Sequence, residues 1–310
     1  MTLQQDHGIA NVTVIGAGTM GAQIASLIAV HGYTVTLTDG FPETLPRAQQ
    51  RIDQEILPAL VAAGIGSLDQ SAARANLAIS ADLEAAARTA DLIIEAVRED
   101  VDVKTELFAH LDALNPTALL ASNSSSIPTR NIISRVTNPS RVLNTHFFAP
   151  IWVRTMVEIM TCGQTDPVNL ERVQQFGQSI SLAAPIVQKE SKGFIINRIW
   201  RAVKQESLKV LDDGVATPED IDRLWMIFFQ TEYPPFGTMD MVGLDVVRDI
   251  EWSYQRETLD ITDKPSAALA AMIAAGNLGE KSGSGFYQHP HPAYQQTSFL
   301  PRPLEPRKES

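Results

Sequence analysis

His146 and Glu158 are the two residues of this sequence whose types and spacing best suit proton transfer. Glu158 lies in the apolar run of residues 156–160, twelve positions after His146, and a carboxylate in such a run needs a partner. An imidazole can accept a hydroxyl proton near neutral pH, while a carboxylate orients the ring and stabilises its charged form. A buried structural histidine and a structural ion pair explain the two residues equally well, so spacing alone leaves these interpretations open.

A polar segment, Ser122-Asn123-Ser124-Ser125-Ser126, follows the strand expected at residues 118–122. Open α/β sheets bind their ligands at the carboxyl ends of the strands, so these hydroxyl and amide groups are candidates for ligand contact. Ser and Asn are also common turn residues, and an ordinary turn is the alternative.

A glycine-rich loop, Gly16-Ala17-Gly18-Thr19-Met20-Gly21, joins an expected strand at residues 12–15 to a helix-like segment at residues 23–30. In a dinucleotide fingerprint the first glycine permits a tight turn, the second lets the backbone approach the pyrophosphate, and the third lets helix and strand pack closely. The helix N-terminus then attracts the phosphates. A turn that only links the two elements is the alternative, but the strand and helix on either side favour a cofactor site.

Asp39 extends this cofactor hypothesis. It ends the expected strand at residues 35–38, eighteen positions after Gly21. A carboxylate there can accept hydrogen bonds from the adenosine ribose and would repel a 2′-phosphate, which favours NAD over NADP. FAD shares the glycine loop, so the loop alone does not identify the cofactor.

The elements that would position these residues alternate between short aliphatic runs and longer helical stretches, which is typical of parallel strands joined by crossover helices. Strands are expected at residues 12–15, 35–38, 77–80, 92–95, 118–122, 141–145, 156–160 and 185–188. The sequence therefore predicts an α/β fold with a mostly parallel sheet over residues 1–189.

Residues 190–310 show a different pattern. Helical spacing covers residues 194–211, 218–228 and 236–257, and Thr217-Pro218-Glu219-Asp220 is a good helix start. An all-helical second domain is expected, followed from His289 by a proline-rich tail that is irregular or partly disordered.

The composition excludes several classes of partner. The net charge of −11 disfavours nucleic acid and anionic membranes, and Cys162, the single cysteine, cannot form an intramolecular disulfide. Residues 1–10 lack the pattern of a signal peptide, and no apolar run is long enough to span a bilayer. We expect a soluble cytoplasmic protein with a small-molecule substrate.

Seven segments in order along the chain together resemble the 3-hydroxyacyl-CoA dehydrogenase family. They are residues 16–21, residues 95–97 with Glu99 and Lys104, residues 122–126, residues 146–148, Glu158, residues 192–198 (Lys-Gly-Phe-Ile-Ile-Asn-Arg) and residues 279–287 (Gly-Glu-Lys-Ser-Gly-Ser-Gly-Phe-Tyr). The resemblance implies a Rossmann-type domain followed by a helical domain that closes over the substrate and forms a homodimer.

The resemblance also implies a role for each matching residue. His146 corresponds to the general base, Glu158 to its orienting carboxylate, and Ser125 and Asn197 to the groups that hydrogen-bond the substrate oxygen. The residues that line the nicotinamide half of the NAD site are Glu99, Lys104, Ser122 and Asn123. The implied reaction needs no metal: His146 removes the proton of a secondary alcohol while the carbinol hydride passes to NAD.

Three departures from the family pattern concern the substrate. Ala149 replaces the usual Asn after His-Phe-Phe, residues 231–237 replace a glycine-rich segment, and no lysine occurs between residues 40 and 90, where several usually meet the phosphates of CoA. Arg47 and Arg51, one helical turn apart, are the expected replacements.

Three functions therefore remain open. The first is NAD-dependent oxidation of a short 3-hydroxyacyl-CoA such as 3-hydroxybutyryl-CoA. The second is oxidation of a free 3-hydroxy acid, as in the gulonate and carnitine dehydrogenases that share this fold. The third, a structural or NAD-binding protein without turnover, is disfavoured because Ser125, His146, Glu158 and Asn197 are all present.

Overall fold

The computed structural model describes residues 7–259, 264–302 and 304, and the chain divides into two compact units, Met1–Ile196 and Asn197–Ser310. The domain boundary expected at residues 189–190 lies a few positions before this division, in the segment between the last strand of the first unit and the first helix of the second.

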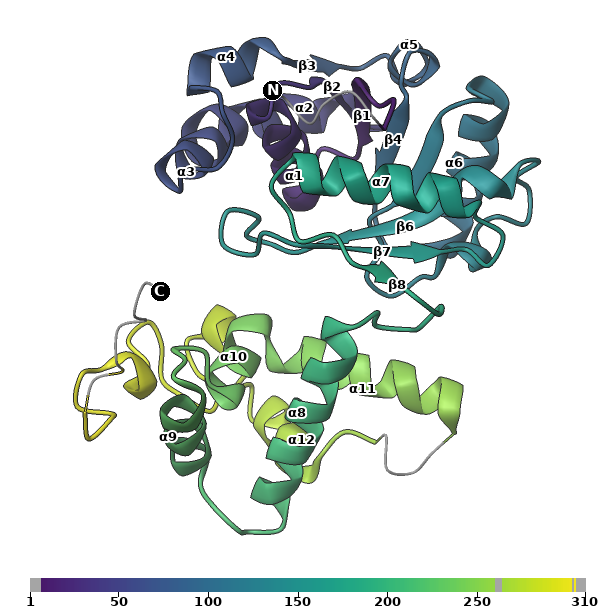
Figure 1. Cartoon of the computed structure of the whole chain (residues 1–310). Coiled ribbons are helices and arrows are strands. Elements are labelled where there is room, and N and C mark those ends of the chain that lie inside the picture. The colour runs from purple at the N-terminus through teal and green to yellow at the C-terminus, as the bar shows by residue number, and fades with distance from the viewer. Residues whose placement is uncertain (1–6, 260–263, 303, 305–310) are drawn as a thin grey trace. The chain divides into compact units, whose positions relative to one another are not determined.

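One eight-stranded sheet organises the first unit (Figure 1), in the order β3-β2-β1-β4-β5-β6-β7-β8. Its strands are β1 (Asn11–Ile15), β2 (Thr34–Thr38), β3 (Leu77–Ser80), β4 (Leu92–Glu95), β5 (Leu119–Ser122), β6 (Val142–Phe147), β7 (Val157–Thr161) and β8 (Ile186–Val187). Neighbours are parallel except β6 and β7, which are antiparallel. The expected mostly parallel sheet is confirmed, and each expected strand overlaps an observed one.

Helices cover both faces of this sheet because its strands carry apolar side chains on both sides. Val14 of β1 and Ile94 of β4 pack in a core with α1 and α7, whereas their neighbours Ile15 and Ile93 pack on the opposite face with α5 and α6. The helices are α1 (Thr19–Val30), α2 (Leu45–Arg51), α3 (Leu57–Ala62), α4 (Gln70–Ala75), α5 (Leu83–Arg88), α6 (Val101–Leu114) and α7 (Pro167–Ser179). This arrangement leaves the carboxyl edge of the parallel strands to the loops.

The second unit is helical, as expected. It contains α8 (Ile196–Asp212), α9 (Pro218–Phe229), α10 (Pro235–Val242), α11 (Leu244–Thr258) and α12 (Ala267–Ala274). Thr217 caps α9, because its hydroxyl accepts a hydrogen bond from the N–H of Asp220. Within the described ranges, none of the helices is both long and apolar enough to cross a membrane.

The expectation of a single helix over residues 236–257 is wrong. Gly243 interrupts it with φ of 98°, so α10 ends there and α11 begins at Leu244. A side chain at Gly243 would be strained at this φ and would lie close to Asp245 and Lys281, which pair with each other. The apolar periodicity continues across the break, which is why the sequence pattern did not reveal it.

The proline-rich segment after His289 is irregular, as expected, but its described part packs against the helices of the second unit, to which it belongs. Tyr294 and Phe299 are buried in the same core as Met226 of α9 and Phe236 of α10. Arg223 of α9 donates to the carbonyl of Phe299 and lies over its ring. The expected partial disorder is therefore wrong for this part, while residues 303 and 305–310 lie outside the described residues.

Gly237→Ala is expected to lower the free energy of unfolding by about 1–3 kcal/mol through overpacking. The added Cβ would lie 2.6 Å from Cε1 of Tyr294. Urea denaturation measures this penalty. In a Tyr294→Ala background, where the ring is absent, Gly237→Ala should lower the free energy of unfolding much less. Gly40→Ala is the control, because nothing lies within 4 Å of its Cβ position. Equal penalties with and without the Tyr294 ring would contradict the packing described above.

Candidate active site

The glycine loop between β1 and α1 is shaped so that only glycine fits at two of its positions. Gly16 has φ of 108°, and a Cβ on Gly21 would lie 1.7 Å from the Gly16 carbonyl oxygen. Gly18 precedes α1, whose first turn has no acidic residue and no side-chain cap. The exposed N–H groups of this helix start therefore remain available to a phosphate, and the loop fits a dinucleotide.

Asp39 lies beside this loop, just after β2. Its carboxylate accepts hydrogen bonds from the backbone N–H of Ala17 at 2.6 Å and of Phe41 at 2.8 Å. These contacts hold the carboxylate at the cavity wall, where its remaining lone pairs can accept from ribose hydroxyls. The ribose-binding role of Asp39 stays a prediction.

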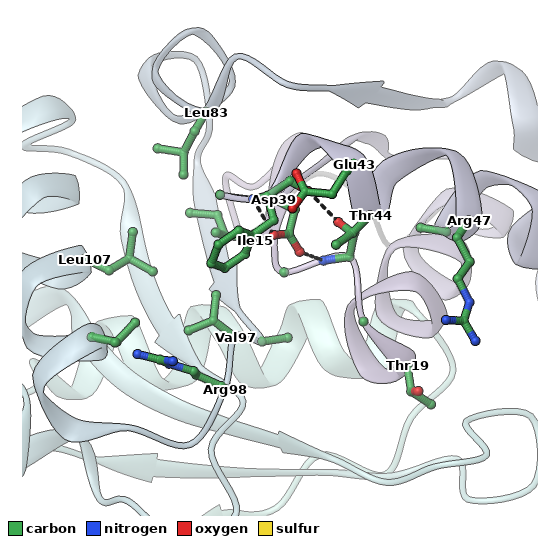
Figure 2. Close-up of a pocket in the computed structure, with 18 of the residues that line it drawn as sticks. Ile15, Thr19, Asp39, Glu43, Thr44, Arg47, Leu83, Val97, Arg98 and Leu107 are labelled. Carbon is green, nitrogen blue, oxygen red and sulfur yellow. Dashed lines mark hydrogen bonds between the residues drawn. The ribbon is translucent and has the colours of Figure 1, made fainter.

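A cavity of about 790 Å³ opens at this point (Figure 2). Its wall is formed by the glycine loop, Asp39, the start of α2, and residues that follow β4 or lie on α5 and α6, including Leu83, Val97, Arg98 and Leu107. Figure 2 shows Arg98 and Leu107 across the cavity from Thr19 and Arg47. A large cavity with mainly apolar walls beside the Asp39 carboxylate suits the adenosine half of NAD.

Arg47 and Arg51 also line this cavity, from α2. Arg51 makes a loose ion pair with Glu55 at 3.8 Å. The structure therefore brings both arginines to the cofactor side of the site, and neither lines the cavity that contains His146.

His146 and Glu158 face each other across the antiparallel pair β6 and β7. The strand register places them opposite one another, with His146 Nδ1 3.0 Å from Glu158 Oε2 and both side chains buried. The second carboxylate oxygen accepts from the N–H groups of Ile195, at 2.9 Å, and Ile196, at 2.8 Å, where α8 begins.

This pairing favours one tautomer of His146. With the proton on Nδ1 the ring donates to the carboxylate of Glu158 and leaves Nε2 as the unprotonated nitrogen. Phe148 and Phe194 pack against the ring, with centroid distances of 4.2 and 4.9 Å. The ring is thereby held in one orientation by a hydrogen bond and by packing.

A second cavity, of about 440 Å³, contains most of the predicted catalytic and nicotinamide-side residues. The predicted residues that line it are Thr19, Met20, Glu99, Lys104, Asn123, Ser125 and His146. Ser122 is buried and does not line it. Asn197 is the second residue of α8 and belongs to the second unit. It is not among the residues that line this cavity, all of which belong to the first unit.

Glu99 organises the serine loop beside this cavity. Its Oε1 accepts from the hydroxyl of Ser124 at 2.6 Å, the N–H of Ser125 at 3.1 Å, and the N–H and hydroxyl of Ser126 at 3.2 and 3.0 Å. Burial raises the pKa of Glu99, but these hydrogen bonds and the charge of Lys104 outweigh burial, so that the pKa is lowered. Ser125 is exposed, and no hydrogen bond to its hydroxyl is formed within the described residues.

Beneath the loop lies a buried ion pair. Lys104 Nζ is 2.5 Å from Glu95 Oε1, and the two side chains are 1% and 0% exposed. Glu95 also accepts from the hydroxyl of Ser122 at 2.7 Å and the N–H of Val97 at 2.7 Å. Burial raises the pKa of Glu95, and the ammonium of Lys104 acts against that shift.

Sequence reasoning assigned no role to Glu95 or Ser124, although a signal for Glu95 was present. Glu95 ends the apolar run Leu-Ile-Ile-Glu of β4, so the argument that a carboxylate in an apolar strand needs a partner applies to it as it does to Glu158. Ser124 had no such signal, because its role depends on Glu99, which is distant in sequence. No group of three or more His, Cys, Asp or Glu residues is placed to hold a metal ion in the described part of the chain.

Comparison with known proteins matches both units to one family. The 3-hydroxyacyl-CoA dehydrogenase NAD binding domain matches residues 11–191, and the 3-hydroxyacyl-CoA dehydrogenase C-terminal domain matches residues 193–289.

Individual relatives match over most of their length. The 3-hydroxybutyryl-CoA dehydrogenase of Mycobacterium tuberculosis is 32% identical over 91% of this chain and 99% of its own. The solved structure of (S)-3-hydroxybutyryl-CoA dehydrogenase from Ralstonia eutropha superposes with a TM-score of 0.84 at 28% identity, over 92% of this chain and 100% of that one. The 5-formyl-3-hydroxy-2-methylpyridine 4-carboxylate 5-dehydrogenase of Mesorhizobium japonicum is 28% identical over 90% of each chain.

Proposed function

Because this chain belongs to the 3-hydroxyacyl-CoA dehydrogenase family and is an NAD-dependent oxidoreductase, we propose that it oxidises the 3-hydroxy group of a short 3-hydroxyacyl-CoA, such as 3-hydroxybutyryl-CoA. The reaction is reversible and gives the 3-ketoacyl product. The observation that carries the proposal is the buried His146–Glu158 pair, of which His146 lines a cavity that also contains Glu99, Lys104 and Ser125.

His146 acts as the base. Its Nε2 takes the proton of the substrate hydroxyl, and Glu158 stabilises the resulting imidazolium through Nδ1–H. Bound NAD supplies the hydride acceptor. Glu158 is itself held by the two N–H groups at the start of α8, so the carboxylate cannot rotate away from the ring without losing hydrogen bonds.

Other predicted residues take supporting roles. Ser125 and Asn197 donate hydrogen bonds to the substrate oxygen as negative charge develops on it. The glycine loop binds the pyrophosphate and Asp39 binds the adenosine ribose, while Glu99, Lys104 and Asn123 line the nicotinamide side and Ser122 supports that side from beneath.

His146→Ala is expected to lower kcat by about 10²–10⁴-fold, because it removes the general base. The Kd for NAD should stay within about twofold of that of the unaltered enzyme, because the glycine loop and Asp39 are untouched. Steady-state rates and calorimetric NAD titration measure the two effects. His110→Ala, which removes an exposed histidine of α6, is the matched control. An undiminished kcat in the His146 variant would remove this residue from the role of base.

The CoA part of the substrate is supported by the names of the relatives in Mycobacterium tuberculosis and Ralstonia eutropha. Arg47 and Arg51 supply positive charge where the family usually has lysines, and we assign them to the CoA phosphates. A free hydroxy acid is the second candidate. Two observations favour it. Both arginines lie on the cofactor side of the site. In addition, the relative from Mesorhizobium japonicum is named for a pyridine carboxylate and not for a CoA thioester.

Initial rates with NAD should favour 3-hydroxybutyryl-CoA over free 3-hydroxybutyrate in kcat/KM. Replacing both arginines (Arg47→Gln with Arg51→Gln) should raise the KM of the thioester by about tenfold through lost charge-assisted hydrogen bonds. The KM of NAD, measured in parallel, separates this effect from damage to the cofactor site. Arg88→Gln, an exposed arginine of α5 that pairs with Glu84, is the control. Turnover of the free acid without turnover of the thioester would overturn the first candidate in favour of the second.

We also propose that the second unit forms a homodimer. Leu224 and Phe228, one turn apart on α9, are 67% and 79% exposed, and Val246 and Trp252 of α11 are also exposed. Exposed apolar side chains one turn apart on a helix, such as Leu224 and Phe228, are typical of surfaces that another protein covers.

Light scattering coupled to size exclusion should report twice the mass of one chain. Replacing Leu224 and Phe228 together by Asp should reduce this to a single chain, because two carboxylates would then be desolvated in the interface. Val153→Asp, at an exposed apolar residue of the first unit, should leave the mass unchanged. A mass that does not respond to the α9 variant would place the interface elsewhere.

A further inference from the structure

We propose that Glu99 makes the cavity at His146 distinguish the two redox states of the cofactor, favouring NAD⁺, whose nicotinamide ring is positively charged, over NADH, whose ring is neutral. The inference rests on the proposed function, because hydride transfer requires the ring to lie in the cavity where His146 meets the substrate. Glu99 and Lys104 line this same cavity.

The charges around the cavity do not cancel. Lys104 is the only cation that lines the described cavity, and its ammonium lies between two carboxylates, 2.5 Å from Glu95 and 3.3 Å from Glu99. Arg98, the neighbouring cation in sequence, lines the larger cavity and pairs with Asp100 at 3.4 Å. One ammonium for two carboxylates leaves a net negative charge.

The ammonium of Lys104 interacts more strongly with Glu95 than with Glu99, because Glu95 is the nearer carboxylate and both members of that pair are buried. The three groups that contact Glu95 are the ammonium of Lys104, the N–H of Val97 and the hydroxyl of Ser122. All three are donors, so the ionised form of Glu95 satisfies them and a protonated form would not.

The remaining negative charge therefore lies on Glu99, whose carboxylate is partly exposed, at 38%. Four hydrogen bonds from the serine loop hold it in place and keep it ionised. A fixed carboxylate in a small, partly desolvated cavity attracts a cationic ring and has little interaction with a neutral one. Oxidation of the substrate removes the charge from the ring, so the same carboxylate weakens the binding of the product NADH relative to NAD⁺.

A purely structural role for Glu99 predicts a different result. Because Glu99 also holds the serine loop, losing it would loosen the site for both forms of the cofactor. The pyrophosphate, the riboses and the adenine are common to NAD⁺ and NADH. Their contributions cancel in the ratio of the two dissociation constants, and this ratio isolates the effect of the ring charge.

The test is to measure the Kd of NAD⁺ and of NADH separately, without substrate, by calorimetry and by NADH fluorescence. Glu99→Gln keeps the shape of the side chain and removes the charge. The ratio Kd(NADH)/Kd(NAD⁺) should fall by about 3- to 10-fold, as for the loss of one partly screened charge near the ring. Circular dichroism checks that the variant is folded.

Two controls separate charge from structure. Glu106→Gln removes the same formal charge from α6, the helix that begins just after Glu99, at an exposed side chain that pairs with Arg135, and should leave the ratio unchanged. Ser126→Ala removes one of the donors that hold Glu99 but keeps the carboxylate, so it should also leave the ratio unchanged. If Glu99→Gln does not fold, the unaltered protein supplies the test: raising the salt concentration screens this partly exposed carboxylate, and the ratio should fall.

An unchanged ratio in the folded Glu99→Gln variant, or an equal change in Glu106→Gln, would overturn the proposal. Because no substrate is present, this result does not depend on which hydroxy compound the enzyme oxidises. Absence of thioester turnover would count against the proposed substrate. It would not affect the conclusion drawn from the ratio of the two cofactor dissociation constants.

Discussion

A carboxylate buried in a sheet must be surrounded by hydrogen-bond donors, and two such carboxylates, Glu95 and Glu158, together with the partly exposed Glu99, account for most of the site. Glu95 recruits Lys104 and Ser122, Glu99 recruits the serine loop, and Glu158 recruits His146 together with the first N–H groups of α8. Leaving any of these acceptors unpaired would cost free energy on the order of a kcal/mol or more. The donors are thereby held in the positions that the chemistry requires.

The sheet topology brings these groups together. Parallel strands place the glycine loop, Asp39, Glu95 and the serine loop at one edge, because all their carboxyl ends point the same way. The one antiparallel step, from β6 to β7, then sets His146 directly opposite Glu158. The same edge thus combines a dinucleotide-binding loop, which tolerates no side chain at Gly21, with a histidine whose ring is oriented by a neighbouring carboxylate.

Predictions from the sequence succeeded where the physical signal was local. Each strand was visible as a short aliphatic run, and the glycine loop was visible because close backbone approach excludes other residues at Gly21. They failed where the deciding feature was a glycine whose special role left no mark on the apolar pattern. The break at Gly243 depends on a left-handed backbone within a continuous apolar pattern, and the packing of Tyr294 depends on the absence of a side chain at Gly237. Neither signal can be distinguished from ordinary glycine usage in one sequence.

The sequence by itself determined the fold class, the dinucleotide loop and the preference for NAD implied by Asp39, and through the family resemblance it supplied the candidate acid–base residues. Only the tertiary structure decided that Nδ1 of His146 faces Glu158, that one lysine is shared by Glu95 and Glu99, and that Arg47 and Arg51 lie on the cofactor side. The reason is physical. Residue type and period encode local backbone preferences and apolar faces, whereas tautomers and charge balance depend on distances between groups that the chain brings together only when it folds.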